Sequence, residues 1–385
     1  MTFMTSRRDL LRSLAALSVL SALPRLSLAS PRTDRRLVVV VLRGGLDGLA
    51  LLPPHSDPSY TTARRRVALP LPGERDGILD LDGFFGLHPA MAGLLPLYAA
   101  GEMLGVHAVG LPNTQRSHFE AQDMLESGGD RPRVLKTGWL NRALTGMTPD
   151  GEPAAVAIGQ GVPLILRGPS TVTSLQPAGS VQQEAPFLEL VTGLYAADPQ
   201  LSEALSQGMM ARALLEEDEP GRGKSGRKQQ ARATGQLLAH ADGPRVAVME
   251  VGGMDTHATQ KSALNNRLGQ LTDGILALKE GLGAAWSETA VVLITEFGRT
   301  VAGNGTGGTD HGGASAALLL GGAVAGGRII SDWPGLTALH EDRDLRVTTD
   351  LRSVLSGVLR DHLGSEHPGT FPGAPPPLSG LIRSV

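Results

Sequence analysis

An uninterrupted run of apolar, mostly β-branched residues at positions 37–42, LVVVVL, restricts the fold of this chain more than any other feature. Such runs are typical of parallel strands, because helices cover a parallel sheet on both sides and leave no face in water. Further strands are predicted at residues 103–109, 245–251, 290–295 and 316–320. The sequence therefore predicts an α/β fold: a mostly parallel central sheet with helices on both faces.

Helical spacing of apolar residues lies between these strands and predicts helices at residues 88–100, 118–125, 264–286 and 350–362. The middle of the chain, at about 130–245, is less regular. It predicts short strands at 154–158 and 164–166, helical character over 188–215, and a polar exposed loop or helix start at 219–232. We expect one domain over residues 30–385, with that insert and a Pro-rich tail at about 364–385.

The first 29 residues have the composition of a secretory signal peptide. Arg7, Arg8 and Arg12 are followed by an uncharged Leu/Ala-rich run at 13–24 and by the small-x-small sequence SLA at 27–29. The apolar run is too short to span a bilayer. Because paired arginines mark the Tat route, we expect export through the Tat translocase to the periplasm or the medium, with no transmembrane anchor in the mature chain.

Composition excludes two classes of site. The formal net charge of -3 and the aromatic content of 3% argue against a nucleic-acid-binding surface, so no nucleic-acid partner is expected. The chain has no cysteine, so a thiolate metal site or a disulfide framework is impossible. Any metal ion must be held by oxygen atoms and imidazoles.

Acidic, histidine and serine side chains gather beside the ends of the predicted strands. They are Asp47, Ser117, His118, Asp255, His257, Glu296, Asp310 and His311. Each has a structural alternative, such as a turn-forming Asp47, a helix-capping Ser117, or a Glu296 paired with Arg299. Ligands bind beyond the carboxyl ends of strands in parallel sheets, so the gathering of these residues predicts one shared metal or catalytic site.

The residue types suggest two kinds of ion. Asp255, His257 and His311 give a carboxylate and two imidazoles, a set found in catalytic zinc sites that keep one position open. Asp47 and Glu296 give carboxylates alone, which suit a harder ion bound more weakly. The expected cofactor is therefore a divalent metal, with zinc, manganese, magnesium and calcium as candidates.

The segments LRGGLDG, LHPAMAGLLPLYAAGEM, RSHFEAQDMLESG, GGMDTH, TEFGRT and TDHGG resemble an exported bacterial family, numbered 1501 among domains of unknown function. The resemblance runs from about residue 37 to about residue 362. It implies an alkaline-phosphatase-like domain within the superfamily that also contains the sulfatases.

The resemblance also implies roles for individual residues. Asp47 takes the place of a ligand to one ion, and Asp255, His257 and His311 the places of ligands to the other. Ser117, with Thr114 as the alternative, resembles the nucleophile at a helix start.

Two departures from the superfamily are present. Asp255 and His257 stand two residues apart, where the superfamily usually has four, and the other departure concerns the second ion. Phe297 stands where a histidine ligand is expected, and phenylalanine cannot coordinate a metal. That ion is therefore either missing or held unusually, with Asp310 as the candidate ligand.

The expected activity is hydrolysis of a phosphate or sulfate ester of a small molecule or carbohydrate. Metal coordination would activate Ser117, and Arg299 or Arg116 would clamp the anionic group. His118 would orient the ester or protonate the leaving oxygen. The alternative is a member of the fold that has lost catalysis and serves as a binding or assembly protein in the cell envelope. Phe297 favours that alternative.

Overall fold

The computed structural model describes residues 34–113, 116–147, 154–159, 161–175, 192–193, 224–241 and 243–384. The apolar run forms β1 (Arg36–Leu42), and each of its residues is buried. Within the described part of the chain, β1 lies in a nine-stranded sheet of order β10-β4-β9-β8-β1-β7-β5-β6, with β11 paired to β4. The other strands are β4 (Met103–Gly110), β5 (Ala155–Ile158), β6 (Val172–Leu175), β7 (Val246–Val251), β8 (Thr289–Ile294), β9 (Ser315–Leu320), β10 (Arg328–Ile330) and β11 (Thr349–Asp350).

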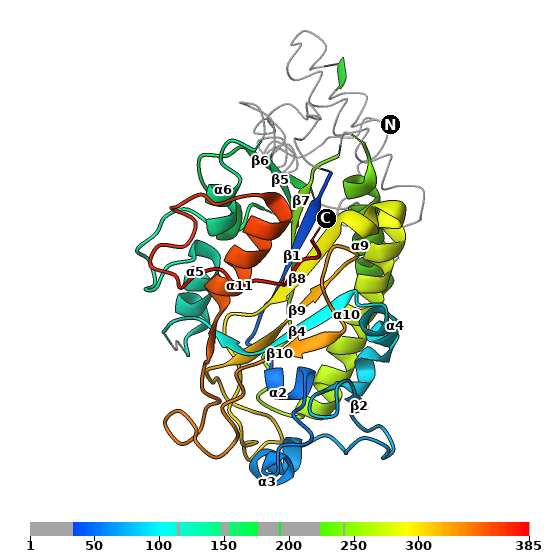
Figure 1. Cartoon of the computed structure of the whole chain (residues 1–385), viewed down its shortest axis with the longest axis vertical. Helices are drawn as coiled ribbons and strands as arrows, with labels where there is room; N and C mark the ends of the chain where they lie inside the picture. The colour runs from blue at the N-terminus through cyan, green and yellow to red at the C-terminus, as the bar shows by residue number, and fades with distance from the viewer. Residues whose placement is uncertain are drawn as a thin grey trace, which may run out of the picture.

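Side chains of β1 alternate between two hydrophobic layers, one on each face of the sheet. Val39 and Val41 pack with α5 (His118–Ser127), α6 (Trp139–Ala143) and α11 (Leu351–Val358). Val38 and Val40 pack with α4 (Leu95–Ala99), α9 (Lys224–Ala239) and α10 (Gln260–Leu282). Figure 1 shows these two groups of helices on opposite sides of the sheet. The predicted α/β architecture is confirmed.

One strand that leads out of the site, β9, breaks the parallel pattern of the sheet. β9 runs antiparallel to both of its neighbours, β4 and β8, whereas β1 is parallel to β7 and β8. A chain that leaves β8 and enters an antiparallel β9 starts and ends its connection at the same edge of the sheet. Residues 295–314 therefore stay at the edge where the parallel strands end.

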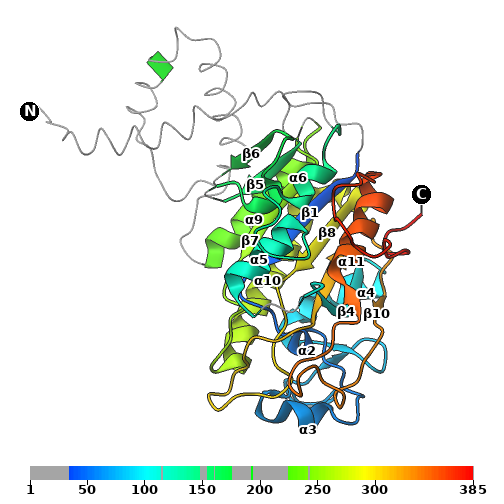
Figure 2. The same ribbon diagram turned by 90° about the vertical axis from the view of Figure 1, so that its left-hand side faces the viewer.

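Two short helices follow β1. α2 (Gly48–Leu51) follows β1 directly, and α3 (Tyr60–Arg64) comes next along the chain. Figure 2 shows α2 and α3 together at one end of the molecule, away from β6. The other elements are the small sheet β2 (Leu79–Asp80) and β3 (Gly86–Leu87), the 3₁₀ turns at Arg65–Val67, Pro89–Leu94, Leu164–Leu166 and Gly283–Glu288, and the π turn at Leu359–Leu363.

One prediction for the middle of the chain needs correction. Residues 164–166, predicted as a strand, form a 3₁₀ turn that follows Pro163 and closes with a hydrogen bond from Leu166 N–H to Pro163 O. Of the two alternatives predicted for residues 219–232, the helix start is found from Lys224, where α9 begins. This helix packs through Ala231 and Leu238 against α10. The predictions for residues 188–215 lie, except for 192–193, outside the described residues, as does the signal peptide.

Within the described ranges, no helix is both long and apolar enough to cross a membrane.

Candidate metal centre

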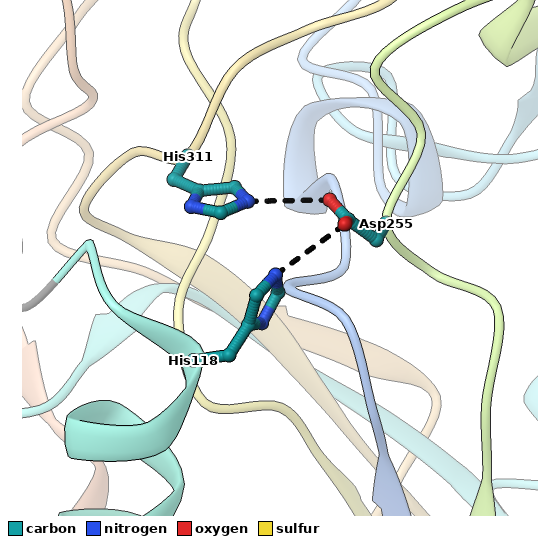
Figure 3. A group of neighbouring side chains, drawn as sticks. All are labelled: His118, Asp255 and His311. Atoms are coloured by element: carbon teal, nitrogen blue, oxygen red, sulfur yellow. Dashed lines mark hydrogen bonds and ion pairs between the residues drawn. The ribbon is translucent and has the colours of Figure 1, made fainter.

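Three side chains from separate elements converge at the edge where β4, β7 and β8 end. His118 begins α5, Asp255 follows β7, and His311 precedes β9. Figure 3 shows both histidine rings directed at the Asp255 carboxylate. His311 Nε2 lies 3.2 Å from Asp255 Oδ1, and His118 Nε2 lies 3.4 Å from Oδ2. One ligand atom from each residue lies within 4.8 Å of the others, close enough to hold a single ion.

A third histidine belongs to the same cluster. His257 Nε2 lies 3.0 Å from Asp255 Oδ1 and 3.0 Å from His311 Nε2. Three of the predicted ligands, Asp255, His257 and His311, are therefore brought together as expected. His118, predicted to contact the substrate, joins them.

Each of the three histidine rings is fixed by an oxygen acceptor at its Nδ1 atom. His118 Nδ1 lies 3.0 Å from Glu296 Oε1, and His257 Nδ1 lies 3.2 Å from Asp310 Oδ1. His311 Nδ1 lies 2.7 Å from the carbonyl oxygen of Arg116. Because a carboxylate or carbonyl oxygen only accepts, each Nδ1 carries the hydrogen. In a neutral ring, Nε2 then presents a lone pair.

When all three rings are in this neutral form, three Nε2 lone pairs face one carboxylate and, in one case, each other. Without a positive charge between them, these atoms repel at the observed separations. A metal ion relieves the repulsion at all four groups at once, whereas a proton relieves it for one pair. Histidines that donate Nδ1–H to an oxygen and turn Nε2 inward are the usual ligands of protein metal sites.

Glu296, a predicted ligand, lies behind His118. It is buried, and its Oε1 also accepts hydrogen bonds from Gly44 N–H (2.8 Å) and the Gln122 side chain (3.1 Å). Burial alone would raise the pKa of Glu296. Hydrogen bonds from its own backbone, Gln122, His118 and Gly44 instead hold the pKa below its usual value. The carboxylate stays charged and orients the His118 ring.

Asp310 has the corresponding position behind His257. Its Oδ1 accepts a hydrogen bond from the Asn304 amide at 3.2 Å besides the one from His257. The Asn304 hydrogen bond is the main cause of the lowered pKa of Asp310. Two carboxylates predicted as ligands therefore contact Nδ1 atoms on the outer side of the cluster.

Asp47 is the predicted ligand that the structure places elsewhere. Its carboxylate is fully buried, caps α2 by accepting from Ala50 N–H, and forms an ion pair with Arg64. The Gln260 side-chain amide donates to the same oxygen as Arg64, at 2.5 Å. Among the described residues, Asp47 is not in the group that converges on Asp255. The positive charge that balances Asp47 is therefore the guanidinium group of Arg64.

Arg299 is buried and pairs with a different acid from the one expected. Its Nη1 donates to Asp255 Oδ1 at 2.9 Å, and its Nε donates to Thr309 Oγ1 at 3.3 Å. Nη2 is buried and has no hydrogen-bond partner in the described part of the chain. Burial raises the pKa of Asp255, but the charge and hydrogen bond of Arg299 outweigh it and lower the pKa. Arg299 thus keeps Asp255 ionised.

Ser117 directly precedes His118 as the N-cap residue of α5. Its side chain makes no capping hydrogen bond, so the hydroxyl is not committed to the helix. Thr114, the alternative nucleophile, lies outside the described residues. Arg116, next to Ser117, is engaged by Asp344 and Glu341.

Two residues that shape the site were not assigned this role from the sequence. Phe297 packs against both His118 and His311, with ring centroids 4.9 and 4.8 Å away, while the two histidine rings contact each other. It therefore holds two ligand rings in place without coordinating anything. Gln260 is buried at the start of α10 and contacts several segments of the site. A glutamine in the first turn of a long helix gives no sequence signal for such a role.

Comparison with known proteins gives a family but no activity. A family model described as "Protein of unknown function (DUF1501)" matches residues 98–364, well over half of the chain. None of the curated proteins matches.

Several solved structures can be superposed on part of this chain, with low TM-scores. A 2-O GAG sulfatase is 10% identical with a TM-score of 0.40, covering 89% of this chain and 73% of its own. The lipoteichoic acid synthase LtaP from Listeria monocytogenes is 9% identical with a TM-score of 0.39, covering 92% and 78%. The phosphonate monoester hydrolase of Agrobacterium radiobacter is 10% identical with a TM-score of 0.39, covering 89% and 78%. Scores at this level carry no argument about activity.

Proposed function

The chain belongs to the DUF1501 family of proteins of unknown function, and on that premise we propose that it is a metal-dependent hydrolase of phosphate or sulfate esters. The observation that carries the proposal is the convergence of three Nε2 atoms on the Asp255 carboxylate. A ligand set of His118, Asp255, His257 and His311 is rich in imidazole. It therefore suits zinc better than calcium or magnesium.

The residues around the cluster supply the other parts that ester hydrolysis needs. A divalent ion bound there would act as a Lewis acid on an ester oxygen. Ser117 holds an uncommitted hydroxyl at the N-terminus of the ten-residue helix α5, where the helix dipole favours an anionic oxygen. Arg299 adds a fixed positive charge beside Asp255. Ser117 is the candidate nucleophile on these grounds.

A binding or assembly role in the cell envelope is the second candidate. Phe297 is committed to packing against two histidines, and Asp47 is committed to its ion pair with Arg64. Both positions would serve a second ion in a two-metal hydrolase. Their present contacts favour a single ion, with less stabilisation of a transferring anionic group.

Metal analysis and two ester assays separate the candidates. We expect purified mature protein to hold about one zinc or manganese ion per chain. We expect it to hydrolyse an aryl phosphate or an aryl sulfate, and to lose that activity with chelator. Stoichiometric metal without hydrolysis of either ester would support the binding role. A protein that stays metal-free in excess zinc and manganese would contradict the hydrolase and favour the binding role.

The His311→Ala variant tests the ligand set. Removing one imidazole should lower retained metal to less than about a tenth of the wild-type content after dialysis against a mild chelator. The matched control is His367→Ala, because His367 is exposed and its Nδ1 accepts a hydrogen bond within its own turn. Equal metal in the His311→Ala and control proteins would remove His311 from the site.

Export by the Tat route is part of the same proposal. It rests on the arginine pair and the signal-peptide order of residues 1–29. Tat substrates cross the membrane folded, which fits a protein that takes up its metal before export.

A further inference from the structure

Gln260 connects the two loops that carry the metal ligands. Its Oε1 atom accepts hydrogen bonds from Thr256 Oγ1 at 2.9 Å and from Thr309 Oγ1 at 2.5 Å. Thr256 stands between Asp255 and His257, and Thr309 comes two residues before His311. Thus one amide oxygen contacts both ligand-bearing loops.

This connection is buried and reinforced by the backbone. Gln260 is 1% exposed, Thr256 3% and Thr309 0%, so water does not compete for their hydrogen bonds. Gln260 N–H donates to Gly307 O at 2.9 Å, and Thr309 N–H donates to Thr256 O at 3.1 Å. The loops are therefore joined at this level by both side chain and main chain.

The orientation of the amide is fixed from its other side. Gln260 Nε2 donates to Asp47 Oδ2 at 2.5 Å, and an ionised carboxylate only accepts. The amide nitrogen must therefore face Asp47, which leaves the oxygen toward the two threonines. Thr309 Oγ1 accepts from Arg299 Nε, so its own hydrogen is available for Gln260. A directed chain of hydrogen bonds runs from Asp47 through Gln260 and Thr309 to Arg299, which holds Asp255.

We infer that Gln260 is a positioning residue that sets the separation between the Asp255–His257 loop and the His311 loop, and so the affinity and geometry of the metal site. This inference rests on the metal site of the proposed function. Gln260 touches none of the four ligands, so it acts through Thr256 and Thr309. Residues that orient metal ligands from behind typically change metal affinity by 10–100-fold when replaced.

Cobalt(II) titration tests the inference, because its visible absorption reports both affinity and coordination geometry. Gln260→Met keeps the length of the side chain but removes its hydrogen bonds. We expect the dissociation constant for Co²⁺ to rise by about 10-fold or more and the absorption bands to shift. Thr272→Val is the control: Thr272 is buried on the same helix, and its hydroxyl donates within the helix to Leu268 O. The control should bind Co²⁺ as the wild type does.

A second pair of variants tests whether Gln260 acts through Thr256. Thr256→Val should weaken Co²⁺ binding, whereas Thr256→Ser keeps the hydroxyl and should restore it to within about threefold of wild type. Combining Gln260→Met with Thr256→Val should cost little more than Gln260→Met alone, because Gln260→Met already removes the hydrogen bond that Thr256→Val removes. If Gln260→Met does not fold, the comparison of Thr256→Val with Thr256→Ser tests the inference on its own.

The outcomes distinguish this inference from the proposed function. Wild-type protein that binds no Co²⁺, zinc or manganese overturns the metal site, and the inference with it. Tight wild-type binding with unchanged affinity and spectrum in Gln260→Met, or in Thr256→Val, overturns the inference alone. Additive losses in the double variant also overturn it.

Discussion

At the scale of single residues, burial decides which carboxylates are free to bind a ligand. Asp47 and Asp255 both follow strands of the same sheet edge. Asp47 is fully buried and ion-paired with Arg64, whereas the Asp255 side chain is 42% exposed and faces three histidines. A buried carboxylate needs a partner inside the protein, and for Asp47 this partner is Arg64.

Removing the Asp47 carboxylate should be costly for stability. Asp47→Ala leaves Arg64 charged and uncompensated in the interior, and we expect the free energy of unfolding to fall by about 3–5 kcal/mol. Urea denaturation of metal-free protein measures the change. Arg75→Ala is the control, since the Arg75–Asp76 pair is exposed and should contribute less than about 0.5 kcal/mol. A loss similar to the control would mean that Asp47 and Arg64 are not paired in solution.

Buried neutral histidines should make stability fall in mild acid. Burial lowers the pKa of His107 to about 4 from an ordinary value of 6.5, and His88 and His362 are shifted in the same way. Between about pH 6.5 and about pH 4, these histidines therefore bind protons in the unfolded chain but not in the folded chain. Stability is present above about pH 6.5 and is lost as the pH falls toward about 4.

His107→Gln should remove one part of this pH dependence. We expect the loss of unfolding free energy between about pH 7 and about pH 5 to shrink by about 2 kcal/mol relative to wild type. Urea midpoints of metal-free protein at the two pH values give the difference. His367→Gln, at an exposed position, should leave the pH dependence unchanged. An equal slope in His107→Gln and wild type would show that folding does not lower the pKa of His107.

At the scale of elements, the direction of β9 explains how a histidine before a strand reaches ligands that follow strands. Gly298 and Gly312 hold the two ends of the connecting loop together through Gly298 N–H to Gly313 O at 2.8 Å and Gly312 N–H to Gly298 O at 2.9 Å. The same pairing brings Arg299 beside His311. The approach is so close that only residues without a Cβ fit.

Gly298→Ala should therefore disturb the site. A Cβ at Gly298 would lie 1.8 Å from Ala314 O, and separating the loop ends should cost about 1–3 kcal/mol of stability and most of the retained metal. Thermal unfolding and metal analysis measure the two effects. The control is Gly305→Ala in the same loop, where a Cβ would meet open space. Wild-type metal content in Gly298→Ala would contradict the close approach.

The sequence predicted the strands of this sheet well and its site only in part. Long apolar runs such as β1 leave little choice of structure, because no other element buries them on both faces. Strand direction is set by pairing partners far along the chain, so β9 could not be oriented from its own residues. The ligands Asp255, His257 and His311 followed from residue type. Placing Glu296 and Asp310 behind histidines required the ring orientations, which only packing and hydrogen bonds determine.

At the scale of the whole molecule, the proposed export signal can be tested apart from the folded domain. Replacing Arg7 and Arg8 together by lysine should leave unprocessed precursor in the cytoplasm, because Tat recognition needs the guanidinium pair. Cell fractionation and immunoblotting measure the distribution. Arg12→Lys, which keeps the pair, should be exported as wild type. Normal processing of the double variant would contradict the Tat assignment.

The proposed ligands His118, Asp255 and His311 come from three elements that are far apart along the chain and are brought together by the folded sheet. No short stretch of the unfolded chain can capture an ion with this set, so uptake has to be a late event that waits for the sheet to assemble. The metal supply that matters is then the one present where folding finishes. For a chain that folds before it crosses the membrane, the ions available in the cytoplasm decide which one is bound. The ion found in the exported protein then shows in which compartment the chain folded.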